Sequence, residues 1–388
     1  MFPYLDFFQL GTDTQPNALI FASIILFAVR NKKVNLPIIL LYIQFLFALS
    51  LFFMNSLGTF TFLKSFINYL SPPLLASAVY TIYSQLKMKL PFKLFLFALL
   101  VYTTVGLVQL YWYNDFMGFL LNANRGTLIG GRGVLSLCPE PAFYGTTCLL
   151  FMVFSLLAYT REQNKIAIPL ILFQFIFLSR SSTGIAILLL AGLLFTVIQL
   201  IRFRLKYILL VSMILAVAIP IGNQQLKKLE DTRIGEIAIS FIENPLNITK
   251  VDGSVGVRFA SSVAPFLNMK YDNFRPKGIG QYKPFLMSLY KSGECRSFLT
   301  VPIINEKDRL DGAINLVLFQ LGMFGLLLPI AIFLAFRPSL KSSIGLFCFL
   351  LFFTLLFTQI KLTQSMIGFI IGYAIYKGTL IRKSSLQV

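Results

Sequence analysis

Long apolar segments recur along nearly the whole chain, separated by short polar stretches. Eleven can be recognised, and most are close to 20 residues long. A helix of about 20 apolar residues crosses the roughly 30 Å hydrocarbon core of a membrane. The pattern therefore predicts an all-α, polytopic integral membrane protein with about 11 transmembrane helices. The predicted segments are 15–30, 34–54, 66–85, 92–112, 140–160, 166–179, 182–201, 206–222, 312–336, 343–360 and 364–380, of which the sixth and eighth are short for a span.

One polar interval is much longer than the others and separates two groups of spans. We predict an N-terminal bundle of about eight spans at 1–222, a large loop at 223–311, and a C-terminal bundle of about three spans at 312–388. Long loops are usually functional or disordered. This one is aromatic and mixed in charge, with a predicted amphipathic helix at Thr232–Ile242 and turn signals at 276–280. We therefore expect an ordered cap on the membrane domain.

Lys and Arg are distributed unequally between the two sides of this plan. One set of loops holds 16 basic residues, and the short loops of the other set hold 5. Loops rich in Lys and Arg stay in the cytoplasm, so the N-terminus and the long loop are predicted to be external and the C-terminus cytoplasmic. The richer set is Arg30, Lys32, Lys33, Lys87, Lys89, Lys93, Arg161, Lys165, Arg202, Arg204, Lys206, Arg337, Lys341, Lys377, Arg382 and Lys383; the poorer set is Lys64, Arg125, Arg132, Arg180 and Lys361.

Composition agrees with this plan and excludes several classes of protein. Only 13% of residues are charged and 57% are hydrophobic, whereas soluble domains are about 25% charged. Of the 15 acidic residues, only Glu162 falls on the cytoplasmic side, so topology explains the net charge of +19 better than nucleic-acid binding does. The chain has no histidine, which excludes His-based triads, general bases and metal ligands. The two external cysteines, Cys138 and Cys295, could pair, although thiols so far apart in sequence are more often unpaired.

The first external motif lies between the fourth and fifth spans. It contains Arg125, a glycine-rich stretch that includes Arg132, and then Glu140 followed by Pro141 at the start of a span. Glycines let a backbone approach a ligand closely, and arginines can hold phosphate oxygens bidentately. An acid at a helix N-terminus is also favourable against the helix dipole, so a purely structural role for Glu140 stays open.

The second motif, Leu178–Gly184, joins the sixth and seventh spans with almost no loop. It would place Arg180 near the interface, at the mouth of any central cavity. The serines and the threonine that follow can cap the next helix, whose N-terminus is an anion site. The alternative is an arginine that extends to lipid headgroups.

Two further motifs lie in and after the long loop. Arg258 and Arg275 each stand among glycines, which suits a phosphate-bearing partner, although solvated loop charges would give the same pattern. Asp311 comes at the entrance of the ninth span, followed by Gly312 and Asn315. It is a candidate helix cap or, at a cavity that faces the membrane surface, a general base.

Taken together, the four motifs resemble the polysaccharide polymerase and O-antigen ligase superfamily of bacterial inner membranes, whose polymerase branch is called Wzy. The resemblance covers about half of the chain, from Arg125 to Gly325. Many members, ligases especially, carry His-Asn at the entrance of the late span, where this chain has Asp311-Gly312. The residues that match are Arg132, Glu140-Pro141, Ser179-Arg180, Arg258, Gly278 and Gly280, and Leu321-Gly322 with Gly325.

The resemblance implies a glycosyltransferase of the bacterial inner membrane that needs neither a metal nor another cofactor. The donor would be a glycan on undecaprenyl pyrophosphate, the acceptor a second lipid-linked repeat unit, and a chain-length regulator is a candidate partner. By resemblance, Asp311 or Glu140 would accept the acceptor's proton. The pyrophosphate would be held by Arg132, Arg180 and Arg258, with Arg275 and Arg125 as further candidates.

Three alternative functions stay open. An O-antigen ligase shares the donor but uses lipid A–core as acceptor, and the missing histidine counts against it. A transporter of lipid-linked sugar usually shows repeated halves and ionisable groups near the middle of the membrane, and neither is found in the sequence. A non-catalytic membrane scaffold would have no need for arginine at four separate external positions.

Overall fold

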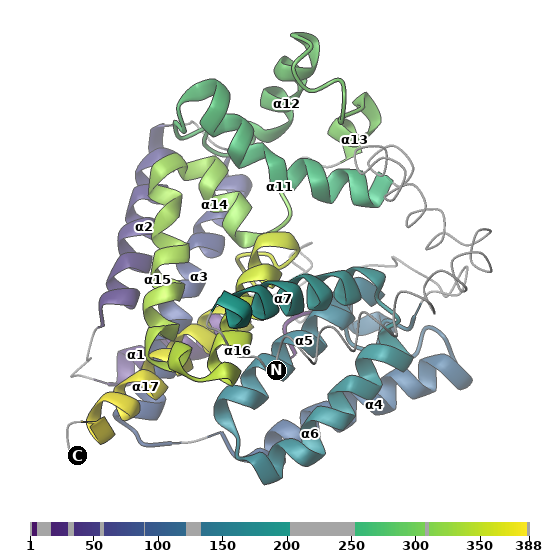
Figure 1. Cartoon of the computed structure of the whole chain (residues 1–388), viewed down its shortest axis with the longest axis vertical. Helices are drawn as coiled ribbons and strands as arrows, with labels where there is room; N and C mark the ends of the chain where they lie inside the picture. Colours follow the sequence, from purple (N-terminus) through teal and green to yellow (C-terminus); the bar gives the residue numbers. More distant parts are fainter. Residues whose placement is uncertain are drawn as a thin grey trace. The chain divides into compact units, whose positions relative to one another are not determined.

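The computed structural model of the chain describes residues 2–5, 17–29, 35–54, 58–88, 90–121, 133–201, 253–306 and 310–385. Within these ranges the regular elements are all helical (Figure 1), apart from one isolated bridge between Leu5 and Leu121. The predicted all-α class is therefore confirmed for the described residues. Arg125, Arg132, the predicted helix at Thr232–Ile242 and the eighth predicted segment lie outside them.

The other ten predicted segments each fall on helix. In the first half of the chain the helices are α1 (Asn17–Ala28), α2 (Leu36–Met54), α3 (Thr59–Ser84), α4 (Phe92–Tyr111), η1 (Gly118–Leu120), α5 (Pro141–Ala158), α6 (Arg161–Phe173), η2 (Gln174–Ser179) and α7 (Ser182–Ile201). In the second half they are α11 (Gly253–Asp272), α12 (Tyr282–Lys291), α13 (Val301–Glu306), α14 (Ala313–Leu321), η3 (Gly322–Leu326), α15 (Leu327–Phe336), η4 (Arg337–Lys341), α16 (Ser343–Thr358) and α17 (Ser365–Ser385).

Five helical runs among the described residues are long and apolar enough to cross a membrane: Leu36–Phe53, Phe92–Tyr111, Pro141–Ala158, Ser182–Ile201 and Ala313–Lys341. A helix meets the requirement of a segment in lipid, because its backbone groups bond to one another within the segment. Many large apolar side chains on them are exposed, among them Phe97 and Leu189. These five support a membrane protein, and the total of eleven spans stays a prediction.

The helices divide into two compact units. Unit 1 contains Met1–Leu189, Leu326–Leu356 and Ile360–Val388, and unit 2 contains Leu190–Gly325 with Phe357–Gln359. Unit 1 thus combines the first helices of the chain with the last ones. Unit 2 contains the described part of the predicted large loop.

The tightest helix pairing in unit 1 joins α3 to α17. Gly368 and Gly372 lie one turn apart on α17, where a methyl group would come within 2.5 Å of the Leu75 Cβ atom and of the Ala76 carbonyl oxygen, respectively. This small-xxx-small spacing lets two membrane helices approach at backbone distance. The pairing joins the third and the last predicted segments of the chain.

Hydrogen bonds at the two ends of unit 1 each join segments that are predicted to lie on the same side of the membrane. At one end, the Tyr159 hydroxyl donates to the Leu90 carbonyl (3.5 Å) and the Lys377 ammonium donates to the Leu157 carbonyl (2.6 Å). These contacts join loops that the basic-residue count assigns to the cytoplasm. At the other end, the Gln364 amide donates to the Tyr4 hydroxyl at 3.0 Å, which joins two segments assigned to the outside.

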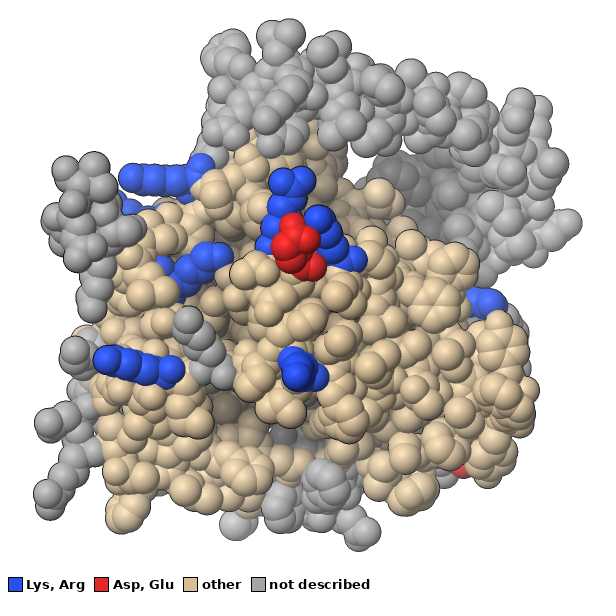
Figure 2. Space-filling model, turned by 90° about the horizontal axis from the view of Figure 1, so that it is seen from below, with Lys and Arg blue, Asp and Glu red and all other residues tan. Residues whose placement is uncertain are grey.

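Figure 2 shows one face on which basic side chains are spread and acidic ones are few. The only acid assigned to the cytoplasm, Glu162, accepts from Lys165 at 2.8 Å on the exposed first turn of α6. Arg161 and Lys341, which also belong to the basic-rich loops, are exposed as well. We expect a reporter fused after Arg204 or Lys341 to read cytoplasmic and one fused within 240–300 to read periplasmic, because of the unequal basic counts. A periplasmic signal after Lys341 would reverse the assigned orientation.

The ninth predicted segment, 312–336, is not one regular helix. It consists of α14, η3 and α15, and the break falls at Gly322, whose φ of 55° and ψ of −131° suit glycine alone. A Cβ atom there would clash with the Phe274 carbonyl oxygen. The backbone of the neighbouring turn also contacts this break. The Lys277 amide donates to the Phe319 carbonyl at 3.3 Å, and the Gly278 amide donates to the Gln320 carbonyl at 3.0 Å.

We expect Gly322→Ala to lower the free energy of unfolding by about 3 kcal/mol, because the backbone strain and the clash act together. Gly192→Ala is the matched control, since no atom lies within 4 Å of a Cβ at that position of α7. It should be neutral or stabilising by about 0.5–1 kcal/mol, since alanine favours helix over glycine. Thermal unfolding of the purified protein in detergent measures both, and equal stability of the two variants would contradict the proposed constraint.

Candidate functional site

The first two external motifs meet in unit 1. The amide of Val134 donates to the Leu178 carbonyl at 2.8 Å, and a Cβ atom at Gly133 would clash with the Ser179 carbonyl oxygen. A methyl group at Gly145 would lie 2.5 Å from the Ser181 Cβ atom. The glycines of the first motif therefore let its backbone pack directly on the segment that carries Arg180.

Arg180 follows an unusual helical turn. Residues Gln174–Ser179 form a π-helix, and Arg180 ends it in the left-handed region, with φ 43° and ψ 36°. The side chain is exposed, and its Nε donates to the Phe177 carbonyl at 3.2 Å. Isolated π-turns and left-handed residues other than glycine occur often at functional sites, where the surrounding structure maintains the strain.

The helix after Arg180 begins with a serine cap. The Ser181 hydroxyl accepts from the Gly184 amide at 3.0 Å, and the Ser181 carbonyl accepts from the Ile185 amide at 3.0 Å. The expected capping role therefore falls to Ser181. The N-terminus of α7 adds a partial positive charge next to the Arg180 backbone, so both features favour an anion at this place.

Glu140 occupies the N-cap position of α5, directly before Pro141 at its first position. Its carbonyl accepts from the Tyr144 amide at 3.1 Å, but its side chain makes no capping hydrogen bond. The side chain is half-buried. Helix capping by a hydrogen bond therefore does not explain why a carboxylate side chain occupies position 140.

A buried polar network supports this region. Gln109 donates to the Ser136 carbonyl at 3.0 Å and accepts from the Ser136 amide at 2.6 Å, while the Ser136 hydroxyl donates to the Tyr102 carbonyl at 2.7 Å. The Tyr144 hydroxyl donates to Gln174 at 3.2 Å. These residues were not predicted from the sequence, because none of them is charged or stands in one of the four motifs' glycine-rich stretches. The two glutamines within apolar segments were the signal, since an amide in such a place must find a hydrogen-bond partner.

In unit 2, Asp311 is buried, with 8% of its surface exposed, and its amide donates to the Ser261 hydroxyl at 3.2 Å. That hydroxyl also lies 3.5 Å from the Tyr282 hydroxyl. Burial raises the pKa of Tyr282 to about 12, and the nearby Asp311 carboxylate adds to the rise. The N-cap of α14 is Gly312, at φ 82°, so Asp311 is not the helix cap.

Arg258 lies on α11, one helical turn before Ser261, and is half-buried. The stretch 253–258, which falls in the predicted large loop, forms the start of α11. The physical reason is its apolar spacing: Val257, Ala260 and Ala264 are buried in a core with α12, α13 and α14. Residues three apart on a helix share a face, so Arg258 lies on the face of α11 that carries Ser261, whose hydroxyl accepts from the Asp311 amide.

Arg275 belongs to the turn that holds the end of α14. Its side chain is exposed, and its carbonyl accepts from the Asn268 amide group at 2.9 Å. The predicted turn is confirmed, with Gly278 at φ 75° and Gly280 at φ 78°. The Lys277 ammonium forms an ion pair with Asp272, and this hydrogen bond lowers the pKa of that carboxyl below its ordinary value.

The structure therefore groups the predicted site residues in two sets. Glu140 and Arg180 belong to unit 1, whereas Arg258, Arg275 and Asp311 belong to unit 2. That Arg132, Arg180 and Arg258 together hold one pyrophosphate group stays a prediction. No group of three His, Cys, Asp or Glu side chains that could hold a metal ion occurs among the described residues. The four cysteines are all buried, free thiols.

Comparison with known protein families gives no match for this chain. A comparison with curated proteins likewise gives no match.

Proposed function

We propose that this chain is a polysaccharide polymerase, a glycosyltransferase that joins repeat units linked to undecaprenyl pyrophosphate at the outer face of a bacterial inner membrane. The observation that carries the proposal is the packing of Gly133 and Val134 on Leu178 and Ser179, directly before Arg180. It brings together two motifs about 40 residues apart in the sequence, in the arrangement expected for recognition of a phosphorylated ligand.

In this proposal an acceptor hydroxyl attacks the anomeric carbon of the donor sugar. A new C–O bond forms, and the bond from that carbon to the pyrophosphate oxygen breaks, so undecaprenyl pyrophosphate leaves with the electron pair. Arg180, with Arg132, Arg258, Arg275 and Arg125, stabilises the negative charge that develops on the leaving group.

The proton of the acceptor hydroxyl passes to a carboxylate and from there to water. Asp311 is the proposed base, since it is buried beside Ser261 and does not cap α14. Glu140 is proposed to orient an arginine or to bind the sugar. The apolar helices would accommodate the polyprenyl tails, and a chain-length regulator is a proposed partner.

The test is the ladder of surface polysaccharide from a strain that lacks this chain. We expect the ladder to disappear while a single repeat unit remains attached to its acceptor. Loss of every repeat unit from lipid A–core would indicate a ligase instead, and an unchanged ladder would contradict both functions. Purified protein with lipid-linked repeat units should form polymer without added metal ions.

A further inference from the structure

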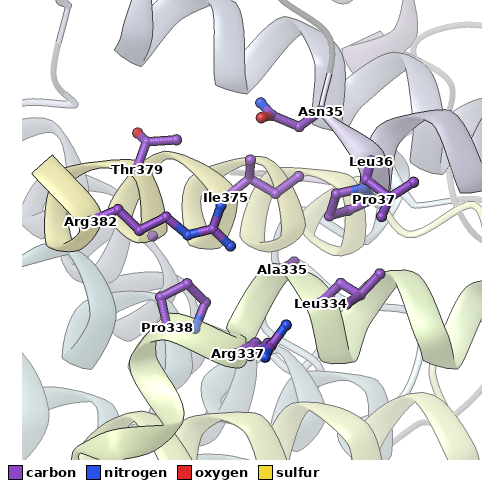
Figure 3. Close-up of a pocket in the computed structure, with 11 residues that line it drawn as sticks. Asn35, Leu36, Pro37, Leu334, Ala335, Arg337, Pro338, Ile375, Thr379 and Arg382 are labelled. Carbon is purple, nitrogen blue, oxygen red and sulfur yellow. The ribbon is translucent and has the colours of Figure 1, made fainter.

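A cavity of about 190 Å³ opens at the end of unit 1 that the basic-residue count assigns to the cytoplasm. Figure 3 shows that three elements line it: the start of α2, the junction of α15 with η4, and the last turns of α17. It is smaller than the roughly 300–1,000 Å³ of pockets that enclose whole drug-sized ligands. Its size suits a small chemical group rather than a complete substrate.

The polar lining of this cavity is cationic. Arg337 extends into it from η4 and Arg382 from α17, so that both side chains point toward the same space (Figure 3). Among the described residues that line it there is no Asp or Glu. Two guanidinium groups from separate elements favour an anion.

A third donor comes from Asn35. Its carbonyl accepts from the Ile39 amide at 3.0 Å and so begins α2, while its side-chain nitrogen is buried without a hydrogen-bond partner. Buried polar groups are nearly always satisfied, so such a nitrogen indicates a missing acceptor. The N-terminus of α2 adds its partial positive charge at the same wall.

The rest of the lining is apolar and continues along the outside of the helices. Leu36, Pro37, Leu334 and Ile375 line the cavity. From Leu36, exposed apolar side chains follow α2 through Ile39, Ile43 and Leu46, and α15 exposes Ile330 and Phe333. An anion in the cavity would therefore lie at one end of an apolar surface. A phospholipid matches this arrangement, because its phosphate group lies at one end of its acyl chains.

We propose that this cavity binds the phosphate group of an anionic phospholipid, with Arg337, Arg382 and Asn35 as its ligands and the acyl chains along α2 and α15. The proposal does not depend on the proposed polymerase activity. Basic pockets between membrane helices on the cytoplasmic side are suited to anionic headgroups. The same donors would also accept inorganic phosphate, so the test must distinguish these two sources.

The experiment measures binding of phosphatidylglycerol to the purified full chain in phosphatidylcholine nanodiscs by native mass spectrometry. The double variant Arg337→Gln/Arg382→Gln should weaken binding about thirtyfold. Asn35→Leu changes no charge and should weaken it about tenfold, because a hydrogen bond to a charged group is lost. The control Lys93→Gln/Arg161→Gln removes two exposed cations that do not line the cavity, and should change binding less than about threefold.

A second arm adds inorganic phosphate instead of the anionic lipid. Binding of phosphatidylglycerol that depends on Asn35 and both arginines, and that millimolar phosphate does not displace, supports the lipid site. If inorganic phosphate binds, the lipid does not, and phosphate binding depends on Asn35 and both arginines, the lipid proposal is overturned and the cavity is a site for free phosphate. Equal losses in the double variant and the control, or full binding by the Asn35 variant, would overturn the site itself.

Discussion

Arg180→Gly is expected to abolish polymerisation and, at the same time, to make the protein more stable. Arg180 holds a left-handed conformation that costs a side-chain-bearing residue about 1 kcal/mol and costs glycine almost nothing. The thermal midpoint should therefore rise by about 1–3 °C. Loss of the guanidinium should lower the rate by about 10²–10³-fold, as for other groups that stabilise developing charge. In vitro polymerisation and thermal unfolding in detergent measure the two effects.

Two further variants separate geometry from charge at this position. Arg180→Lys should recover little activity, because an ammonium cannot reproduce bidentate contacts to phosphate oxygens. Lys87→Gly is the matched control: Lys87 is exposed and also left-handed, at φ 53°, but lies in a loop assigned to the cytoplasm. It should gain similar stability and keep full activity. Full activity of Arg180→Lys would disprove phosphate recognition by guanidinium geometry.

Asp311→Asn is expected to lower polymerisation by about 10²–10⁴-fold, the usual contribution of a general base. The substitution keeps the size of the side chain and the amide that donates to Ser261, so donor binding should not change. The measurement compares the rate at saturating lipid-linked repeat unit with the affinity for the donor. Wild-type rates for this variant would remove Asp311 from the mechanism.

The matched control for Asp311→Asn is Asp272→Asn. Asp272 belongs to the same unit but pairs with Lys277 near the surface, and its loss should leave the rate unchanged. Ser261→Ala removes the hydroxyl that positions Asp311 and should cost about tenfold. Glu140→Gln should weaken activity through geometry, and a larger loss there than at Asp311 would exchange the two proposed roles.

Apolar segments located the strongly apolar helices of this chain, because about 20 apolar residues in a row are the signal of a membrane helix. The helices α11, α12 and α13, which lie in the predicted large loop, were not predicted. The differences lie where charged residues begin a helix. α3 starts at Thr59 rather than 66, with the Lys64 ammonium 4.1 Å from the Phe60 ring. α6 starts at Arg161 rather than 166, because Thr160 and Gln163 form a capping box. Local side-chain contacts thus extend helices beyond their apolar parts.

Features that depend on contacts distant in sequence were not predictable. The break at Gly322 depends on the Phe274 carbonyl, and the contact of Gly133 with Ser179 depends on how α5 and η2 pack. The π-turn before Arg180 has no signature in the residues Gln174–Ser179 themselves. The sequence could therefore indicate which residues carry chemistry, but not which of them meet.

The pairing of α3 with α17 determines when this protein can finish folding. About 300 residues separate Ala76 from Gly372, and at about 5–20 residues per second the ribosome needs roughly 15–60 s to make them. During that time α3 lacks the helix with which it packs most closely. A chain that lost its last helix would keep every residue proposed for the polymerase reaction and still leave this interface open. We therefore expect such truncated chains to be degraded rather than to retain partial activity.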